Sequence, residues 1–231
     1  MDRNKWFLGY REMPRNKQKK INRLKNSVFP SHPECQMDEV ASYSSSGPKI
    51  TQFIVKMLEQ KIGNLGDLTF TDATACVGGQ TVVFAEHFRI VNAFEIDPFR
   101  AEMLKHNVRV TGAENVNCYH ADLTQSYQKY PSQDIIYLDP PWGGSNYKKE
   151  TDIELWLSNE RLAHVAERLA PKTRYILIKY PYNYNIEKMP PASSQLKKIW
   201  NGYYPLMPKE RYALFEVDET DSVPKKHRVL L

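Results

Sequence analysis

The sequence predicts an α/β fold, in which a doubly wound, mostly parallel sheet is followed by a C-terminal antiparallel hairpin. Short apolar segments alternate with amphipathic ones along most of the chain, which is typical of a parallel sheet with helices on both faces. Hydrophobic residues make up 41 % of the 231 residues, which is enough for a globular core. No stretch approaches the roughly 18 consecutive apolar residues of a transmembrane helix, so we expect no membrane span.

Glycine and proline mark the ends of the two clearest helices. Apolar residues recur at three- and four-residue steps between Gly47-Pro48 and Gly63, which predicts a helix there. A second helix is expected over 98–110, because proline suits a first turn and Gly112 follows its end. The other expected elements are strands at 68–73, 90–95, 116–119, 134–138, 175–179, 196–203 and 212–217, and helices at 80–88 and 152–170.

Positive charge is concentrated at the N-terminus. Residues 1–26 hold nine Lys and Arg against two acids, whereas the rest of the chain is close to neutral. A basic arm on a near-neutral body is typical of an arm that meets phosphate, although a solvated tail has the same composition. We expect residues 1–35 to be partly disordered, or helical only on binding.

The chain divides by composition into four parts. A basic arm covers 1–35, a helical segment that contributes to the site covers 36–66, a catalytic core covers 67–219, and a polar basic tail covers 220–231. Three cysteines with no CxxC pair argue against a disulfide scaffold or a zinc ribbon, so we expect no metal and a reducing intracellular compartment. The first residues lack the apolar centre of a secretory signal.

Acidic residues end three successive predicted strands. Asp72 precedes a turn with Thr74, Gly78 and Gly79, and it is followed 23 residues later by Glu95. Ligands bind at the carboxyl ends of such strands, where an acid can accept hydrogen bonds from ribose hydroxyls. The GxGxxG pattern of a dinucleotide site is absent, which argues against a nicotinamide dehydrogenase.

A third acid, Asp122, follows the third strand. Three acids at strand ends suit a ligand that carries adenosine and a cationic centre but no phosphate, and S-adenosylmethionine has this chemistry. The alternative is that these acids cap helices, as Asp97 before Pro98 is placed to do.

The fourth strand runs directly into Asp139-Pro140-Pro141-Trp142-Gly143-Gly144. The prolines fix the backbone, so the Asp139 carboxylate and the Pro140 carbonyl are held rigidly, and Trp142 offers a flat surface for stacking. Two acceptors can orient an exocyclic amine toward a methyl donor, and positioning supplies most of such catalysis. The structural alternative is a rigid proline turn with a core tryptophan.

This hexapeptide, with Asp72-Ala73 and Val77-Gly78-Gly79 upstream, resembles the trimethylguanosine synthase family over roughly residues 40–217. The resemblance implies a class I, Rossmann-like methyltransferase core. Such enzymes methylate N2 of the 7-methylguanosine cap of RNA and convert S-adenosylmethionine to S-adenosylhomocysteine. The chain departs from the family pattern at Cys76, where glycine is usual, and at Gly47, where threonine is usual.

The resemblance also implies which residues form the site. Glu95 matches the acid that holds the ribose, Asp122 matches the acid near the adenine, and Trp142 matches the residue that stacks on 7-methylguanine. The expected cofactor contacts are Asp72, Thr74, Gly78, Gly79, Glu95, Asp97, Asp122 and Asp139, the expected catalytic residues are Asp139, Pro140 and Trp142, and the expected substrate contacts are Ser45, Asn107, Trp142 and Tyr147.

The sequence therefore predicts a methyltransferase of the RNA cap, with capped RNA as partner and the basic arm on RNA phosphates. We expect a monomer in the nucleus or the cytoplasm, of a host cell if the source is viral. One alternative is an N2-guanine or N6-adenine methyltransferase that acts on internal sites of structured RNA or DNA, because a flipped base can use the same loop. Another is a non-catalytic module that binds caps or RNA.

Overall fold

The computed structural model describes residues 13–189 and 195–218. The chain divides into two compact units, which are described separately below. Unit 1 contains the residues up to 68 and residues 72–121, and unit 2 contains residues 69–71 and those from 122 onward. The expected tail at 220–231 lies outside the described residues.

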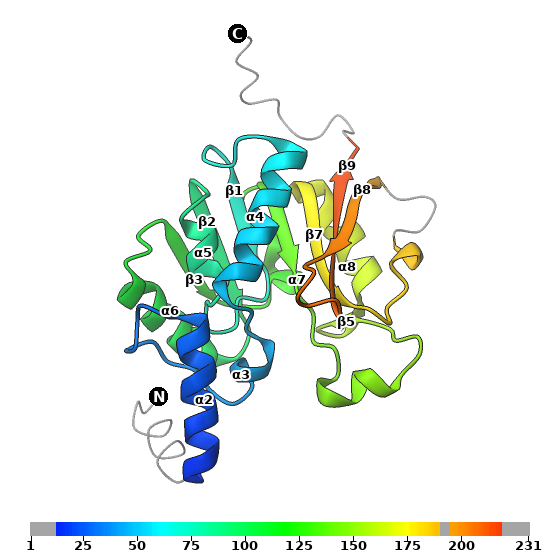
Figure 1. The fold of residues 1–231 in the computed structure, drawn as a ribbon. Helices are drawn as coiled ribbons and strands as arrows, with labels where there is room; N and C mark the ends of the chain where they lie inside the picture. Colours follow the sequence, from blue (N-terminus) through cyan, green and yellow to red (C-terminus); the bar gives the residue numbers. More distant parts are fainter. Residues whose placement is uncertain (1–12, 190–194, 219–231) are drawn as a thin grey trace. The chain divides into compact units, whose positions relative to one another are not determined.

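The predicted sheet is confirmed. Its seven strands follow the hydrogen-bonded order β3-β2-β1-β4-β7-β9-β8. The β2/β3 and β4/β7 pairs are parallel, and the β7/β9 and β8/β9 pairs are antiparallel, so a C-terminal hairpin completes a mostly parallel sheet. The strands are β1 (Thr69–Asp72), β2 (Ile90–Glu95), β3 (Val116–His120), β4 (Gln133–Leu138), β7 (Thr173–Pro181), β8 (Leu196–Tyr203) and β9 (Glu210–Val217) (Figure 1).

The long helices of unit 1 begin and end where the sequence indicates. Helix α4 (Pro48–Ile62) starts at its proline, and Gly63 follows it. Helix α6 (Pro98–Thr111) is capped by Asp97, whose Oδ1 accepts hydrogen bonds from the backbone N–H groups of Phe99 and Arg100 at 2.9 and 3.0 Å. Helix α5 (Thr81–Ala85) is shorter than expected.

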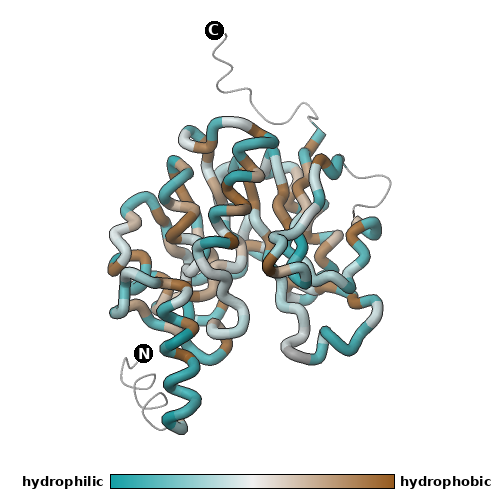
Figure 2. The backbone as a smooth tube through the Cα atoms, in the orientation of Figure 1, coloured by the Kyte–Doolittle hydropathy of each residue, from teal (hydrophilic) through white to brown (hydrophobic). Residues whose placement is uncertain are grey.

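The N-terminal region of unit 1 differs from the expectation. Residues Arg15–Val28 form helix α2, and Ala41–Ser44 form the short helix α3. Ile21 and Val28 anchor α2, since both are buried in a cluster that includes Val77 and Met103. Figure 2 shows that α2 is otherwise mainly hydrophilic. Apolar burial on one face is therefore enough to order this helix, and only residues 1–12 of the arm lie outside the described part.

One predicted helix of unit 2 is wrong in its first half. Helix α8 covers only Leu162–Leu169, and it follows a two-stranded hairpin of β5 (Trp156–Leu157) and β6 (Glu160–Arg161). Ile153, Leu155 and Leu157 are buried at alternate positions, which is the period of an extended chain rather than of a helix.

The remaining elements of unit 2 are short. They are α7 (Leu123–Ser126) and the 3₁₀ turns η1 (Tyr127–Lys129), η2 (Gly144–Lys149), η3 (Ala170–Lys172) and η4 (Ile186–Lys188). None of the described helices, in either unit, is long and apolar enough to cross a membrane.

Candidate active site

In unit 1, Asp72 fixes the turn between β1 and α5. Its Oδ2 accepts a hydrogen bond from the Thr81 hydroxyl at 2.7 Å, and its Oδ1 lies 3.3 Å from the Thr74 backbone N–H. The carboxylate is buried, so these bonds hold the residues that follow the strand in one conformation.

The two glycines of this turn are required by close packing. Gly78 has φ of +87°, and a Cβ there would lie 2.8 Å from Cδ1 of Leu104. A Cβ at Gly79 would lie only 2.5 Å from Cγ1 of Val28, in helix α2. Ser45 is also next to Gly79, and its Oγ is buried without a hydrogen-bond partner among the described residues. The turn thus leaves no room for side chains, and it has an unused polar group beside it.

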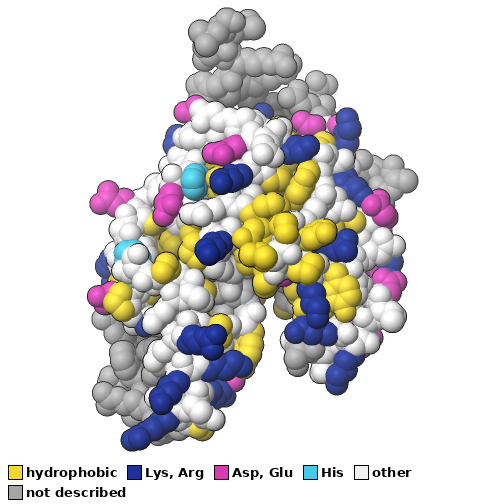
Figure 3. All heavy atoms as spheres, viewed as in Figure 1, with side chains coloured by type: hydrophobic (Ala, Val, Ile, Leu, Met, Phe, Trp, Pro, Cys, Tyr) yellow, Lys and Arg dark blue, Asp and Glu magenta, His cyan; other side chains and the backbone are white. Residues whose placement is uncertain are grey.

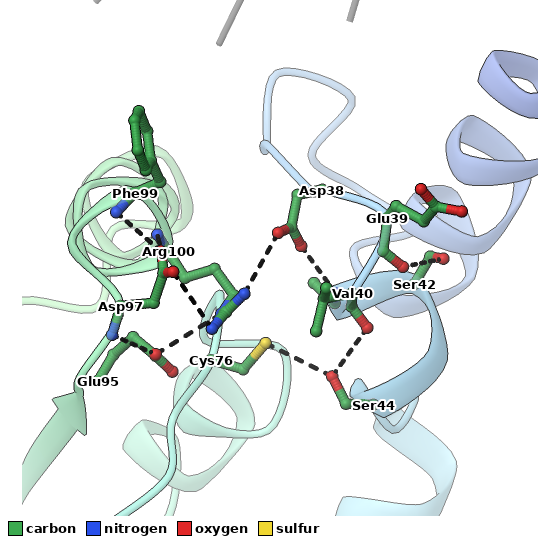
Figure 4. Close-up of polar contacts among 11 residues, drawn as sticks. Asp38, Glu39, Val40, Ser42, Ser44, Cys76, Glu95, Asp97, Phe99 and Arg100 are labelled. Atoms are coloured by element: carbon green, nitrogen blue, oxygen red, sulfur yellow. Dashed lines mark hydrogen bonds and ion pairs between the residues drawn. The ribbon is translucent and has the colours of Figure 1, made fainter. Parts of the chain in front are cut away.

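Cys76 has the backbone conformation that glycine adopts easily. Its φ is +53°, in the left-handed region that costs a non-glycine residue roughly 1–2 kcal/mol. Its Sγ lies 3.6 Å from the Ser44 hydroxyl, as Figure 4 shows. Burial raises the pKa of the thiol to about 12, so it stays protonated at neutral pH.

Glu95, at the end of β2, is the centre of a charged cluster. Its Oε1 accepts a hydrogen bond from the Asp97 backbone N–H at 2.8 Å. The Arg100 guanidinium lies 3.5 Å from Glu95, from Asp97 and from Asp38 (Figure 4). Burial raises the pKa of Glu95, while the Asp97 amide and the Arg100 charge oppose that rise. Sequence reasoning identified Glu95 and Asp97 but missed Arg100 and Asp38, which no local pattern indicates.

Asn107, an expected substrate contact, is fully buried in unit 1. Its Oδ1 accepts from the Gln36 backbone N–H at 2.7 Å, and its Nδ2 donates to the carbonyls of Gln36 and Val77 at 2.8 Å each. The amide therefore ties the N-terminal segment to the turn that contains Gly78. Its contacts are with the protein's own backbone.

In unit 2, Asp122 caps a helix. Its Oδ1 accepts hydrogen bonds from the backbone N–H and the hydroxyl of Thr124 at 2.8 and 2.7 Å, and Ser158 donates to its Oδ2. The capping alternative is thus observed for Asp122, as it is for Asp97.

Asp139 forms a buried ion pair that the sequence did not reveal. Leu138 of β4 is in register with Ile178 of β7, so the next residues, Asp139 and Lys179, are neighbours. The Lys179 Nζ lies 3.0 Å from Oδ2 of Asp139 and 3.6 Å from Oε2 of Glu210. Lys179 is only 4 % exposed.

The charges of this cluster depend on one another. Burial raises the pKa of Asp139, and the charge of Lys179 opposes that rise. Burial on its own would lower the pKa of Lys179, but the carboxylates of Asp139 and Glu210 raise it above its ordinary value. Lys179 is therefore a cation at neutral pH, and it favours the ionised form of Asp139.

Trp142 lies beside the same ammonium group. The Lys179 Nζ is 5.3 Å from the centre of the Trp142 ring, and the Tyr147 ring meets it edge-on at 5.3 Å. The indole N–H is buried and has no hydrogen-bond partner among the described residues. Pro140 is buried, and Gly143 and Gly144 both have positive φ, so the chain turns sharply after the tryptophan. Unit 2 thus brings Asp139, Pro140, Trp142 and Tyr147 together with Lys179 and Glu210.

The residues of unit 1 fit the S-adenosylmethionine that the sequence predicts. Glu95 and Asp72 supply acceptors, which suit hydroxyls and a cation rather than phosphate, and a Cβ at Gly78 or Gly79 would collide with neighbouring side chains. Among the described residues, no group of three or more His, Cys, Asp or Glu side chains could hold a metal ion.

Comparison with known proteins agrees with this geometry. Residues 69–214 match the family described as RNA cap guanine-N2 methyltransferase. The chain belongs to this family. The match runs from the first residue of β1 to Leu214 in β9, so this protein has the fold of a methyltransferase and belongs to a family of methyltransferase enzymes.

Two relatives of this member of the family come from a virus and a yeast. An uncharacterised protein of Acanthamoeba polyphaga mimivirus is 28 % identical over 200 residues, which cover 74 % of this chain and 78 % of the relative. Trimethylguanosine synthase of Schizosaccharomyces pombe is 24 % identical over 163 residues, 66 % of this chain and 65 % of that protein.

A solved structure shares the fold. The 16S rRNA N2 G1207 methyltransferase of Thermus thermophilus, solved with AdoMet and guanosine, has a TM-score of 0.54 and 14 % identity. The similarity covers 79 % of this chain and 44 % of that one.

Proposed function

We propose that this protein transfers a methyl group from S-adenosylmethionine to the exocyclic N2 of the 7-methylguanosine cap of RNA. The observation that carries the proposal is the buried Asp139–Lys179 pair beside Trp142, in a loop held by two prolines. Membership of the cap guanine-N2 family and the similarity to a yeast trimethylguanosine synthase support the choice of substrate.

Asp139 and the Pro140 carbonyl act as acceptors for the two hydrogens of the amine. An exocyclic N2 is a weak nucleophile because its lone pair is delocalised into the ring, so holding both hydrogens orients the lone pair. Lys179 donates a hydrogen bond to Oδ2 of Asp139 and stabilises the negative charge of the carboxylate, which makes it a stronger acceptor for the amine. A charged acceptor also favours the transition state, in which the nitrogen becomes positive.

Trp142 is the stacking surface for the base. Lys179 lies over its ring and Tyr147 meets its edge, so the indole is held in place before a base arrives.

Unit 1 holds the cofactor in this proposal. Glu95 would accept hydrogen bonds from the ribose, while Asp72, Thr74, Gly78 and Gly79 form the turn against which the cofactor packs. When bound, S-adenosylmethionine supplies the activated methyl group. Asp97 of unit 1 is a further proposed contact, and Asp122 of unit 2 is another; both cap helices.

The substrate contacts differ in how they would act. Ser45 has a buried hydroxyl free to bond a ligand among the described residues. Asn107 instead positions the N-terminal segment, through Gln36 and Val77.

The proposal extends to the partner and the compartment. The basic arm binds phosphates of capped RNA, and the enzyme acts as a monomer. A capped substrate would put the reaction in the nucleus or the cytoplasm, of a host cell if the source is viral.

The test compares 7-methyl-GTP with GTP as methyl acceptors, with labelled S-adenosylmethionine and identification of the product by mass. Preferred methylation of 7-methyl-GTP supports the proposal. Trp142→Ala should weaken base binding by about 1–3 kcal/mol, whereas Asp139→Ala should lower turnover more than base affinity. Cap binding without turnover would favour a non-catalytic module.

One observation favours a second candidate, N2 methylation of guanine at internal sites of structured RNA. The Lys179 ammonium already lies over the Trp142 ring, and a second cation gains less from that ring than a first one does. Equal turnover of GTP and 7-methyl-GTP would support this candidate and contradict the cap proposal.

A further inference from the structure

Helix α2 has two faces, and their cations differ in whether they have partners within the protein. On the side toward unit 1, Lys17 forms an ion pair with Glu39 at 2.5 Å, and Lys25 donates to the Pro33 carbonyl at 2.5 Å. These two cations and the buried Ile21 and Val28 attach the helix to its own unit.

The other face of α2 carries a stripe of unpaired cations. Arg15, Lys19 and Arg23 are exposed, and among the described residues none of them has an ion pair or a hydrogen bond. They are spaced by four residues, so they project from one face at intervals of about 6 Å along the axis. The helix contains no acid, and Figure 3 shows Lys and Arg side chains gathered over it.

An exposed aromatic ring continues this surface. Tyr43 of α3 is 68 % exposed, although tyrosine is large and partly apolar. The Nζ of Lys20, in α2, lies 5.0 Å from the centre of the Tyr43 ring, so the ring stands at the edge of the basic face. Tyr43 is two residues before Ser45, a proposed substrate contact.

We propose that α2 and Tyr43 form a track for single-stranded RNA. Arg15, Lys19 and Arg23 bind successive phosphates, and Tyr43 stacks on a base. A regular row of cations with an adjacent aromatic ring is the combination that binds single strands, since phosphates and base faces recur along the strand whatever its sequence. The track goes beyond the proposed methyl transfer, and it rests on that function only in taking the strand to be the RNA that follows the cap.

The first experiment removes the stripe and compares it with a matched helix. Arg15→Gln/Lys19→Gln/Arg23→Gln is measured beside Lys49→Gln/Lys56→Gln/Lys61→Gln, which removes three exposed lysines from α4 of the same unit. The probe is a fluorescent, 12-nucleotide, capped RNA of unstructured sequence, titrated at several salt concentrations. The slope of log affinity against log salt is negative, and for the stripe variant it should become shallower by about 2. Each phosphate contact on a single strand contributes roughly 0.7 to its steepness. The α4 variant should keep the wild-type slope.

The second experiment tests the aromatic end. Tyr43→Leu should lower affinity for the same RNA roughly 5- to 150-fold while the salt slope stays unchanged, because stacking on one base contributes about 1–3 kcal/mol and releases no counterion. Tyr43→Phe, which keeps the ring, should bind like wild type. Thermal unfolding of each variant checks that the fold is retained.

Two results would overturn the track. One is a stripe variant whose slope matches that of the α4 variant, and the other is a Tyr43→Leu variant that binds like wild type. Tighter binding of a blunt RNA duplex than of the single strand would also contradict it, because a duplex hides its base faces.

The proposed function is tested separately by wild-type methylation of 7-methyl-GTP, which is too short to reach a track of several phosphates. If this nucleotide is methylated and the stripe has no effect on RNA binding, the track is wrong and the function stands. If neither 7-methyl-GTP nor GTP is methylated, but the salt slope for uncapped RNA still depends on the stripe, the track is supported and the proposed function is wrong.

Discussion

Glu95 in unit 1 and Asp139 in unit 2 are both acids at the carboxyl ends of strands, yet their charges are held differently. An oxygen of Glu95 accepts a backbone N–H at 2.8 Å, and its cation, Arg100, stands farther off at 3.5 Å and is shared with two other acids. Asp139 instead has a closer, buried ammonium at 3.0 Å, that of Lys179, which it shares with Glu210 at 3.6 Å.

The two acids should therefore respond differently when their cations are removed. A backbone amide cannot be removed by changing a side chain, so the charge of Glu95 survives the loss of its arginine. The charge of Asp139 depends on Lys179, because burial otherwise favours the neutral acid. Unit 1 therefore tolerates changes around its acid better than unit 2 does.

The largest expected effect is that of Lys179→Met. Removing one partner of a buried pair leaves an uncompensated charge, which costs about 3–5 kcal/mol. Here two acids, Asp139 and Glu210, lose their partner. The free energy of unfolding, measured by urea denaturation at pH 7, should fall by that amount.

Arg100→Met is the matched control in unit 1. Of the three acids that pair with Arg100, Asp38 and Asp97 are partly exposed to solvent, and Glu95 keeps its hydrogen bond from a backbone amide. The free energy of unfolding should therefore fall by about 1 kcal/mol or less. The double variant Lys179→Met/Glu210→Gln should recover part of the loss. Equal losses for Lys179→Met and Arg100→Met would contradict the comparison.

Glu95→Ala should have the next largest effect, on cofactor affinity. Hydrogen bonds to a charged acceptor contribute about 1.5–3 kcal/mol each, so S-adenosylmethionine should bind tenfold or more weakly. Calorimetry measures this directly, and Glu210→Gln, a residue of unit 2 that is not a proposed cofactor contact, serves as the comparison. Unchanged affinity in Glu95→Ala would remove that residue from the cofactor site.

The smallest expected effect is a shift of the pH profile. Asp139 must be ionised to stabilise the positive charge that develops on the nitrogen. Because burial raises its pKa, turnover should decline on the acid side at a higher pH than an exposed carboxyl, with a pKa of about 3.9, would give. Arg100→Met should leave the pH of this decline unchanged. If turnover declined only near the pKa of an ordinary exposed carboxyl, Asp139 would not be the required acceptor.

Much of the fold was predictable from local patterns. The strands Ile90–Glu95 and Leu196–Tyr203 have the predicted bounds, because their apolar runs are flanked by turn residues. The prediction of one helix over 152–170 is wrong in its first half, because Ile153, Leu155 and Leu157 alternate as in an extended chain and the helical period begins only at Leu162.

Helix α2 was expected only as one alternative to disorder, for a related reason. Its many lysines hide a sparse apolar stripe of Ile21, Leu24 and Val28, which is sufficient to pack one face. The stripe was visible in the sequence and was outweighed by composition.

The candidate site was predictable only where a motif is contiguous. Asp139-Pro140-Pro141-Trp142 could be read directly, but Lys179 and Glu210 reach Asp139 through the pairing of β4, β7 and β9, which no local spacing encodes. The same holds for Asp38, which meets Arg100 across 62 positions of the chain. The contacts of Asn107 could not be predicted either, because its side-chain amide bonds the backbone of Gln36, 71 positions away, and of Val77.

The close approach of Gly79 to Val28 has a thermodynamic consequence. Since a Cβ at Gly79 would lie 2.5 Å from Val28, the end of α2 cannot move toward the turn without moving it. If a strand on α2 changes the affinity of the turn for its ligand by some factor, then that ligand must change the affinity for the strand by the same factor. Such coupling would be measurable from either side, as a change in the affinity for one ligand when the other is present.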